Sequence, residues 1–321
     1  MKAIICTKYG PPEVLQWVET EQPVPKDNEI LIRVKATAVN SGDCRIRRAD
    51  PFLVRLVFGF SKPRNPILGT TLAGIVESVG EKVTRFKPGD EVFGSAEMQM
   101  GAHAEYVCVS EKSALASMPP QWSFQQAAAI PFGANTALSF LRLANIQPGH
   151  KVMIYGASGA VGTAAVQLAK YFGAEVTAVC SNASTTLVKG LGADRVLDYT
   201  FNDFDAVTEE WDVIFETVNK IPVRKIARRV KKGGTLILGA AIIKEMLQGQ
   251  WISITRKRKV LMGTHAPTPD DMNALKQLMI AGDLKPVIDR IYPLENTAEA
   301  HRYVDTGRKK GNVVIVVDHA S

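Results

Sequence analysis

The residues of this 321-residue chain best suited to chemistry form a glycine-rich turn, Gly156-Ala157-Ser158-Gly159-Ala160-Val161-Gly162. Glycines let a backbone turn sharply and approach a ligand closely. The first N–H groups of a following helix have no partner within that helix, and with the helix dipole they favour an anion such as a pyrophosphate. The turn therefore predicts a dinucleotide site. The alternative is a tight turn that binds nothing.

The flanks of the turn have the pattern that such a site requires. Lys151 to Tyr155 is a short β-branched and aromatic run, typical of a buried strand. Apolar residues then recur at helical spacing as far as Phe172, Gly173 ends the helix, and Glu175 to Cys180 predicts a second strand. Strands and helices continue to alternate as far as Leu238, with a helix expected over Val223–Val230, and this indicates a doubly wound parallel sheet.

The rest of the chain has a different pattern of predicted strands and helices. Up to residue 122 it is rich in short strands separated by glycine and proline turns, and this predicts an antiparallel, barrel-like domain. After residue 264 the elements fit poorly as further units of the parallel sheet. They are a helix over Pro269–Ala281, another over Thr297–Thr306 and a strand over Asn312–Val317. We expect one domain of residues 1–122 and 265–321, and a second of residues 123–264.

Composition narrows the class of protein. The net charge of +7 and the basic runs leave nucleic acid open, but such runs are usually solvated faces, and no base-reading motif accompanies them. The four cysteines have no disulfide or metal spacing, which fits free thiols in a reducing compartment. No secretory signal is visible, and Pro51–Phe60 is too short to span a bilayer. We expect a cytoplasmic protein without membrane or nucleic-acid partners.

Several segments together match one family. They are Val39-Asn40-Ser41-Gly42-Asp43, Gly69 to Gly80, Phe86 to Gly94, Ala104-Glu105-Tyr106, the glycine turn, Leu191-Gly192-Ala193-Asp194 and Lys310 to Val316. The chain resembles the medium-chain dehydrogenase/reductase superfamily and, within it, the zinc-free quinone oxidoreductase (zeta-crystallin-like) branch. The resemblance implies an α/β protein with a GroES-like β-barrel substrate domain built from both termini, a Rossmann domain between them, an active site in the cleft, and a homodimer.

Zinc is not expected. Zinc-dependent relatives place a cysteine where Asn40 stands and a His-Glu pair where Thr70 and Thr71 stand, and they carry a four-cysteine lobe that is missing here. Catalytic zinc needs three ligands of the His, Cys or carboxylate type. Neither asparagine nor threonine replaces them, and Cys44 is better interpreted as an ordinary thiol.

The expected cofactor is NADPH. NAD enzymes usually carry an acid at the end of the second strand, and residues 179–183 contain none. Ser181, Asn182 and Ser184 can instead donate hydrogen bonds to a 2′-phosphate, and Tyr199 matches a tyrosine used near that phosphate in similar quinone oxidoreductases. The resemblance implies further cofactor contacts at Thr136, Tyr155, Thr217, Gly239, Ala240, Thr264, His265 and Asn312.

The expected reaction is hydride transfer to a quinone or an α,β-unsaturated carbonyl, because neutral donors can hold the charge that such an acceptor delocalises onto oxygen. Asn40 and Thr136 match cleft positions, with Asp43 behind them. Alternatively Asn40 caps a turn and Asp43 caps a helix. Other functions left open are a zinc-type alcohol dehydrogenase and a non-catalytic NADPH-binding protein that recognises RNA or senses redox state.

Overall fold

The computed structural model describes residues 1–200, 204, 207–240, 245, 248–249, 258–263 and 265–319. Contacts divide the chain into two compact units. Unit 1 contains Met1–Phe132, Ala266–Gly282 and Pro286–Ser321, and unit 2 contains Gly133–His265 and Asp283–Lys285. Each unit is described by itself.

Unit 1 is built on a sheet in the order β14-β15-β3-β4-β5-β7, with β6 pairing with β3 beside this path. Its strands are β3 (Glu29–Val39), β4 (Thr71–Val79), β5 (Glu91–Ser95), β6 (Tyr106–Ser110), β7 (Leu115–Ser117), β14 (Ile288–Pro293) and β15 (Asn312–Val316). The pair β14–β15 is parallel and the other pairs are antiparallel. A hairpin of β1 (Lys2–Cys6) and β2 (Leu15–Glu19) accompanies the sheet.

The core of unit 1 explains why the C-terminal segment returns to it. Ile30, Ile32 and Val34 of β3 are fully buried, and they share one apolar cluster with Val313 and Ile315 of β15. Burying such side chains is the main favourable contribution to folding. β15 pairs antiparallel with the end of β3, so the last strand of the chain lies inside this sheet, between β14 and β3.

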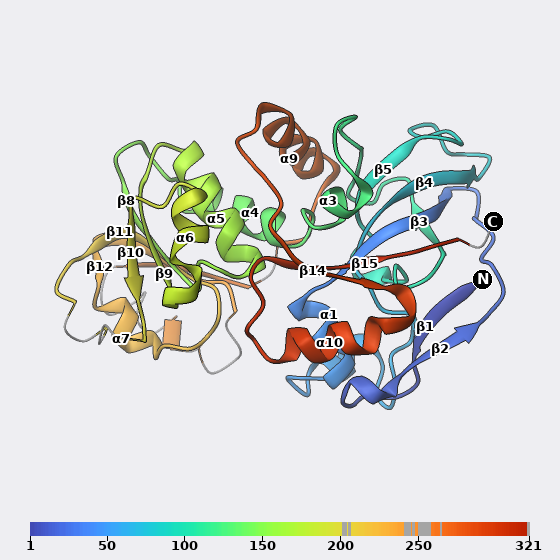
Figure 1. Ribbon diagram of the computed structural model, residues 1–321, viewed down its shortest axis with the longest axis horizontal. Coiled ribbons are helices and arrows are strands. Elements are labelled where there is room, and N and C mark those ends of the chain that lie inside the picture. The colour runs from blue at the N-terminus through green and yellow to red at the C-terminus, as the bar shows by residue number, and fades with distance from the viewer. Residues whose placement is uncertain are drawn as a thin grey trace. The chain divides into compact units, whose positions relative to one another are not determined.

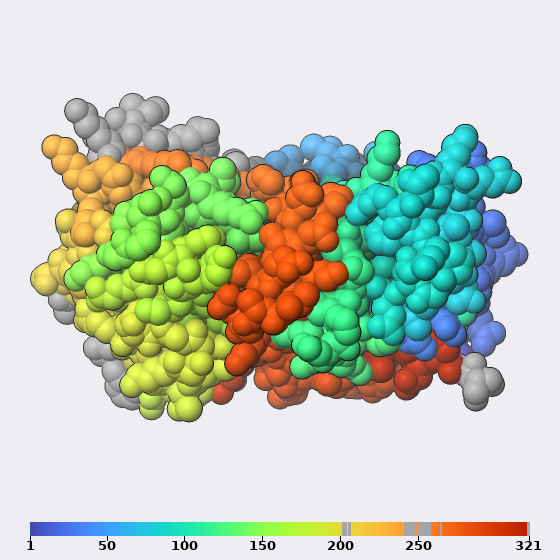
Figure 2. All heavy atoms as spheres, turned by 90° about the horizontal axis from the view of Figure 1, so that it is seen from above, coloured from blue at the N-terminus to red at the C-terminus, as the bar shows by residue number. Residues whose placement is uncertain are grey.

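Two helices of unit 1 are joined by a buried ion pair. Helix α1 (Ser41–Arg48) packs against α10 (Thr297–Asp305). The side chain of Arg47 has no exposed surface and binds the carboxylate of Asp305, which also accepts a hydrogen bond of 2.6 Å from Arg48. The shorter helices are α2 (Val54–Phe58) and α3 (Phe124–Ala128). Helix α9 (Pro269–Ala281) packs on β7 and forms an orange ridge on the surface in Figure 2.

Unit 2 is a six-stranded parallel sheet in the order β10-β9-β8-β11-β12-β13 (Figure 1). The strands are β8 (Lys151–Tyr155), β9 (Glu175–Cys180), β10 (Arg195–Asp198), β11 (Trp211–Glu216), β12 (Val230–Leu238) and β13 (Lys259–Met262). The helices are α4 (Gly133–Leu143), α5 (Ala160–Tyr171), α6 (Thr185–Gly190) and α7 (Val223–Ala227). The chain runs outward from β8 in one direction and from β11 in the other. Ligands of such sheets bind where the strand order reverses.

Two of the differences between the structure and the expected elements are several residues long. The helix expected over Val223–Val230 ends at Ala227, because Val230 already pairs with Trp211 at the start of β12. The boundary expected after residue 122 lies after Phe132, because α3 packs against β3, β4 and β5 of unit 1. None of the described helices is long and apolar enough to cross a membrane.

Candidate functional site

The glycine turn after β8 has a backbone that only glycine adopts without strain at its first position. Gly156 has φ +83°, and a Cβ there would lie 2.6 Å from both Thr217 Oγ1 and Val218 Cγ1. The N–H groups of Gly156 and Ala157 both donate to the Val179 carbonyl of β9 at 3.0 Å. The turn is therefore fixed between the ends of β9 and β11.

The other two glycines of the turn differ in what surrounds them. A Cβ on Gly162 would lie 2.2 Å from the Gly156 carbonyl oxygen, so glycine is required for α5 to pack on the turn. Gly159, the N-cap of α5, has ordinary extended backbone (φ −79°, ψ 176°), and a Cβ there would meet only the Gly156 oxygen, at 3.7 Å. No side chain caps the helix at this residue. The space beside the N-cap of α5 is thus open, as a bound pyrophosphate requires.

A buried carboxyl fixes the loop that follows β11. Glu216 is 2% exposed, and its Oε1 accepts hydrogen bonds from the N–H groups of Val218 at 3.0 Å and Lys220 at 3.4 Å. Burial raises the pKa of this carboxyl, and the hydrogen bonds from the loop oppose the shift. The adjacent Thr217 hydroxyl donates to the Tyr155 carbonyl at 2.9 Å. Glu216 was not among the predicted site residues, and the available signal was an acidic residue at the end of an otherwise apolar strand.

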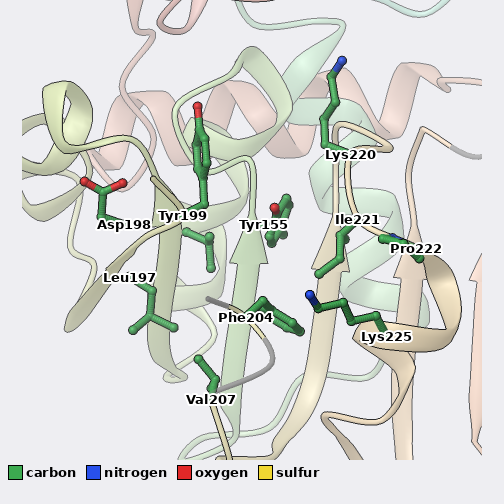
Figure 3. Close-up of a pocket in the computed structure, with 11 residues that line it drawn as sticks. Tyr155, Leu197, Asp198, Tyr199, Phe204, Val207, Lys220, Ile221, Pro222 and Lys225 are labelled. Atoms are coloured by element: carbon green, nitrogen blue, oxygen red, sulfur yellow. The ribbon is translucent and has the colours of Figure 1, made fainter. Parts of the chain in front are cut away.

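A small cavity of about 240 Å³ opens beside this loop, at the carboxyl ends of β8, β9 and β10. It is lined by Tyr155, Val179, Leu197, Asp198, Tyr199, Phe204, Val207, Lys220, Ile221, Pro222 and Lys225. The rings of Tyr155 and Phe204 meet edge to face at 6.2 Å. Figure 3 shows the Lys225 amine pointing toward Phe204, while the side chains of Tyr199 and Lys220 extend away from that ring. An apolar slot with polar side chains at its rim suits one planar aromatic ring such as a nucleobase.

An acidic residue lies beside the end of β9, although the residues that directly follow β9 contain none. Asp198 of β10 lies opposite Cys180 in the sheet, so a search confined to the residues that follow β9 misses it. Its Oδ1 accepts hydrogen bonds from the hydroxyl and the N–H of Thr200, at 2.7 and 2.8 Å, and these lower its pKa. Ser181 is half-buried and Asn182 is exposed, but Ser184 is only 2% exposed, which leaves little room for a phosphate on its hydroxyl.

The remaining predicted cofactor residues divide between the units. Helix α4 carries the half-buried Thr136 and packs beside α5. The Gly239 N–H donates to the Glu216 carbonyl at 2.8 Å, with Ala240 next in the chain. His265 also belongs to unit 2, whereas Thr264 lies outside the described residues. Asn312 begins β15 in unit 1, where its Nδ2 donates to the Val287 carbonyl at 3.1 Å.

In unit 1 the structure brings Asn40 and Asp43 together. Asn40 is the N-cap of α1, and its Oδ1 accepts hydrogen bonds from the N–H groups of Gly42 at 2.8 Å and Asp43 at 3.1 Å. The Asn40 N–H in turn donates to Asp43 Oδ2 at 3.0 Å, which completes a capping box. The Asn40 Nδ2 donates to Thr70 Oγ1 at 2.8 Å. The alternative expected Asn40 to cap a turn and Asp43 to cap the helix; instead Asn40 is the helix N-cap, and Asp43 is the third helical residue, because its carboxylate accepts the Asn40 N–H. Thr70 joins the cluster as a residue that the sequence-based prediction left out.

The Asp43 carboxyl has an unusual environment. It is fully buried, and burial raises its pKa to about 7. The hydrogen bond from the Asn40 N–H, at 3.0 Å, opposes this shift, as do the nearby polar groups of Thr70 and Gly69. Its Oδ1 nevertheless has no hydrogen bond of ordinary geometry. A buried carboxyl of this kind is partly protonated near neutral pH.

Comparisons with known proteins agree with this architecture. Residues 26–120 match the model of the alcohol dehydrogenase GroES-like domain, and residues 191–315 match that of the zinc-binding dehydrogenase. The chain is 33% identical to a 2-methylene-furan-3-one reductase of Solanum lycopersicum, over 98% of this chain and 79% of that protein. It is 30% identical to a chloroplastic NADPH-dependent alkenal/one oxidoreductase of Arabidopsis thaliana, with the same coverage.

A solved structure agrees with these sequence matches. The quinone oxidoreductase of Coxiella burnetii superimposes with a TM-score of 0.90 at 29% identity, covering 99% of both chains. The chain belongs to the medium-chain dehydrogenase/reductase superfamily. The expected family and the expected fold, a GroES-like domain with a Rossmann domain, are thereby confirmed.

The zinc site of metal-dependent members of this superfamily can be tested against the residues present. Asn40, Thr70 and Thr71 stand at the three matching positions. The Asn40 oxygen is already occupied by two N–H groups, and Asp43 is the one carboxylate in the cluster. Across the described part of the chain, no group of three or more His, Cys, Asp or Glu side chains is arranged to hold a metal. These donors do not fit catalytic zinc.

Proposed function

We propose that this protein is an NADPH-dependent reductase of quinones or α,β-unsaturated carbonyls that works without zinc. The observation that carries the proposal is the open N-terminus of α5 at Gly159, in a unit that also holds a nucleobase-sized cavity. The named relatives reduce alkenals, enones and quinones, and one of them is named for its dependence on NADPH. We assign the cofactor to unit 2 and the acceptor to unit 1.

In this proposal the first turn of α5 binds the cofactor pyrophosphate through its N–H groups, and the cavity holds the adenine ring. Tyr199, at the cavity rim, donates its hydroxyl to the 2′-phosphate. Lys220 and Lys225 are among the residues that line the same cavity, and their positive charge favours the phosphorylated cofactor despite the carboxylate of Asp198. NADPH supplies the hydride when it is bound.

The acceptor needs a hydrogen-bond donor for its oxygen and an apolar contact for its carbon skeleton. Asn40, Asp43 and Thr136 are the proposed polar residues at the acceptor. For the apolar contact we propose α2 and its flanks, where Phe52 and Leu56 are 59% and 61% exposed. Large exposed apolar side chains side by side mark a binding surface more often than chance placement.

The experiment that tests this proposal has two stages. The purified chain is titrated with NADPH and with NADH, followed by cofactor fluorescence, and NADPH is expected to bind more tightly. NADPH oxidation is then measured with a 2-alkenal, an alkenone and a naphthoquinone. Tight NADPH binding without turnover of any acceptor would refute the reductase. Stoichiometric zinc in the purified protein would favour the alcohol dehydrogenase alternative.

We further propose that the protein is a cytoplasmic homodimer. Cys6, Cys44 and Cys180 are buried free thiols, which suits a reducing compartment. β13 ends the parallel sheet on one side, and an edge strand can pair with a second copy. Light scattering on the purified chain gives the subunit number, and a monomeric mass at micromolar concentration would contradict the dimer.

A further inference from the structure

Helix α2 of unit 1 has apolar side chains on the side that faces solvent. Its inner side is ordinary, because Val54 and Phe58 pack against the core cluster of the unit. The opposite side of a surface helix normally carries polar residues. Here every exposed side chain between residues 52 and 60 is large and apolar.

These exposed side chains form one patch, which we call the α2 patch and define by Phe52, Leu53, Leu56, Val57 and Phe60. Fourteen large apolar side chains are well exposed in the described part of the chain, and five of them belong to this patch. Apolar residues scattered singly over a surface are normal, whereas a contiguous group marks an interaction site. The α2 patch therefore needs a partner.

The fold holds this patch in its exposed arrangement. The Tyr9 hydroxyl donates to the Gly59 carbonyl at 2.6 Å. The Arg55 guanidinium lies over the rings of Tyr9 and Phe52, at 5.0 and 5.4 Å, and donates to the Phe60 carbonyl at 3.2 Å. The rings of Phe52 and Phe60 meet edge to face at 6.2 Å. The apolar side chains are thus presented by a fastened segment.

Positive charge borders the α2 patch. Residues 51–66 carry three basic side chains, Arg55, Lys62 and Arg64, and no acidic residue. Two of them lie directly beside Gly59, where a Cβ would be 2.3 Å from the Lys62 carbonyl oxygen and 3.3 Å from Arg64 Cγ. Lys62 and Arg64 are exposed, so their charges are available to a partner of negative charge.

This combination of apolar and basic side chains distinguishes among the possible partners. Two copies of the chain meeting through the same patch would bring like charges together, because a two-fold contact places each patch on itself. A peptide is usually bound in a groove or at an open sheet edge, whereas this patch is the outer side of a helix. The surface of an anionic bilayer satisfies both features, since apolar side chains enter the boundary of the acyl chains and basic ones bind headgroups.

We propose that the α2 patch binds the surface of a membrane that contains anionic lipids, with Lys62 and Arg64 against the lipid phosphates. The sequence-based expectation of no membrane partner came from the length of Pro51–Phe60, and that length excludes a span but not binding at a surface. The net charge of +7 favours the same partner. The proposal goes beyond the reductase function, and it places the protein where apolar acceptors dissolve.

The experiment measures flotation of the purified chain with vesicles, in the absence of NADPH and acceptor. One vesicle preparation is phosphatidylcholine alone, and the other contains phosphatidylserine as well. Phe60→Ser removes an apolar side chain that is 69% exposed, and Lys62→Glu reverses a charge. The matched controls in unit 1 are Val24→Ser, at a side chain that is 84% exposed, and Lys87→Glu, at an exposed lysine outside the patch. Urea unfolding checks that each variant is folded.

The wild type is expected to float with the vesicles that contain phosphatidylserine, more weakly with phosphatidylcholine alone, and less at high salt. Phe60→Ser should weaken binding to both preparations by about 10-fold, the lower end of what burial of a phenylalanine side chain contributes. Lys62→Glu should weaken binding to the anionic vesicles by at least about 5-fold, the contribution of one basic residue. Both control variants should bind as the wild type does.

Three results would overturn the proposal. The first is a wild type that does not bind anionic vesicles at low salt. The second is equal binding by the wild type, Phe60→Ser and Lys62→Glu, because the overall positive charge would then explain the attraction. The third is a wild-type dimer that dissociates in Phe60→Ser and binds no vesicles, which would assign the patch to a second copy of the chain. Since neither cofactor nor acceptor is present, failure of the reductase function would be seen separately.

Discussion

Replacing Gly159 by serine should stabilise the protein without its cofactor and weaken cofactor binding. The chain's own packing gives no reason for glycine at this N-cap, because the backbone is extended and the nearest atom to a Cβ is 3.7 Å away. Serine is a slightly better N-cap than glycine, and it removes backbone entropy from the unfolded chain. Together these effects should raise the free energy of unfolding by about 0.5–1 kcal/mol.

The same substitution should reduce NADPH affinity by about 10- to 150-fold. A serine hydroxyl at the N-cap accepts from the N–H groups of the second and third helical residues, Val161 and Gly162, which we assign to the pyrophosphate. Losing one hydrogen bond to a charged group costs about 1.5–3 kcal/mol, and this corresponds to that range of affinity. The two effects of one substitution thus have opposite signs.

Urea unfolding without nucleotide and fluorescence titration with NADPH measure the two effects. The matched control is Gly190→Ser, at the exposed end of α6, where a Cβ meets nothing within 4 Å. It should leave NADPH affinity unchanged. If Gly159→Ser binds NADPH as tightly as the wild type, the α5 N-terminus is not the pyrophosphate site. A large loss of stability would instead show that the fold itself requires this glycine.

Three further predictions, one with a control substitution, have definite expected outcomes. Gly162→Ala places a Cβ 2.2 Å from a carbonyl oxygen of the turn, and we expect a loss of about 1–3 kcal/mol in urea unfolding together with weaker NADPH binding. Asp305→Ala leaves the buried Arg47 charge unpaired and should lower the free energy of unfolding by about 3 kcal/mol. Its control, Glu13→Ala, removes an exposed ion pair and should change the urea midpoint little. Equal effects of the two substitutions would contradict the burial argument. Burial raises the pKa of Asp43 from 3.8 to about 7. Between these values the folded protein retains a proton that the unfolded chain has released. The contribution of this proton to the free energy of unfolding is therefore full below about pH 4 and is lost as the pH rises through 7. Asp43→Asn should therefore flatten the pH dependence of unfolding between pH 4 and 8, and an unchanged slope would refute this assignment.

The elements that the sequence predicted best are those whose pattern is local. The bounds of β8, β9 and α9 agree with the predicted ranges residue for residue, since a short apolar run between turn residues or a proline and a glycine at the helix ends define each of them. The domain boundary was harder. Whether the segment of α3 belongs to one unit or the other depends on which sheet it packs against, and that is a long-range contact.

Prediction of the site residues from the sequence had the same limit. The glycine turn could be predicted because its residues are consecutive, whereas Asp198 reaches the end of β9 only through strand pairing. Ser184 has the right chemistry at the right spacing, yet the loop that carries it turns its side chain inward. The cavity residues Phe204 and Lys225 come from separate segments with no shared motif, so no pattern in the sequence joins them.

At two positions the residue present is not the one that would best stabilise the fold. Gly159 lies where the cofactor is proposed to bind, and Asp43 lies beside the proposed acceptor. Gly159 stands at an N-cap where serine or aspartate would stabilise the chain, and Asp43 carries a carboxyl into a site that leaves one oxygen without a hydrogen bond. Asn40 shows the opposite case, because its amide is committed to capping α1 and to orienting Thr70. Thr70 is the half-buried member of this cluster, so its hydroxyl is the group of the cluster best placed to contact an acceptor, with Asn40 and Asp43 buried behind it.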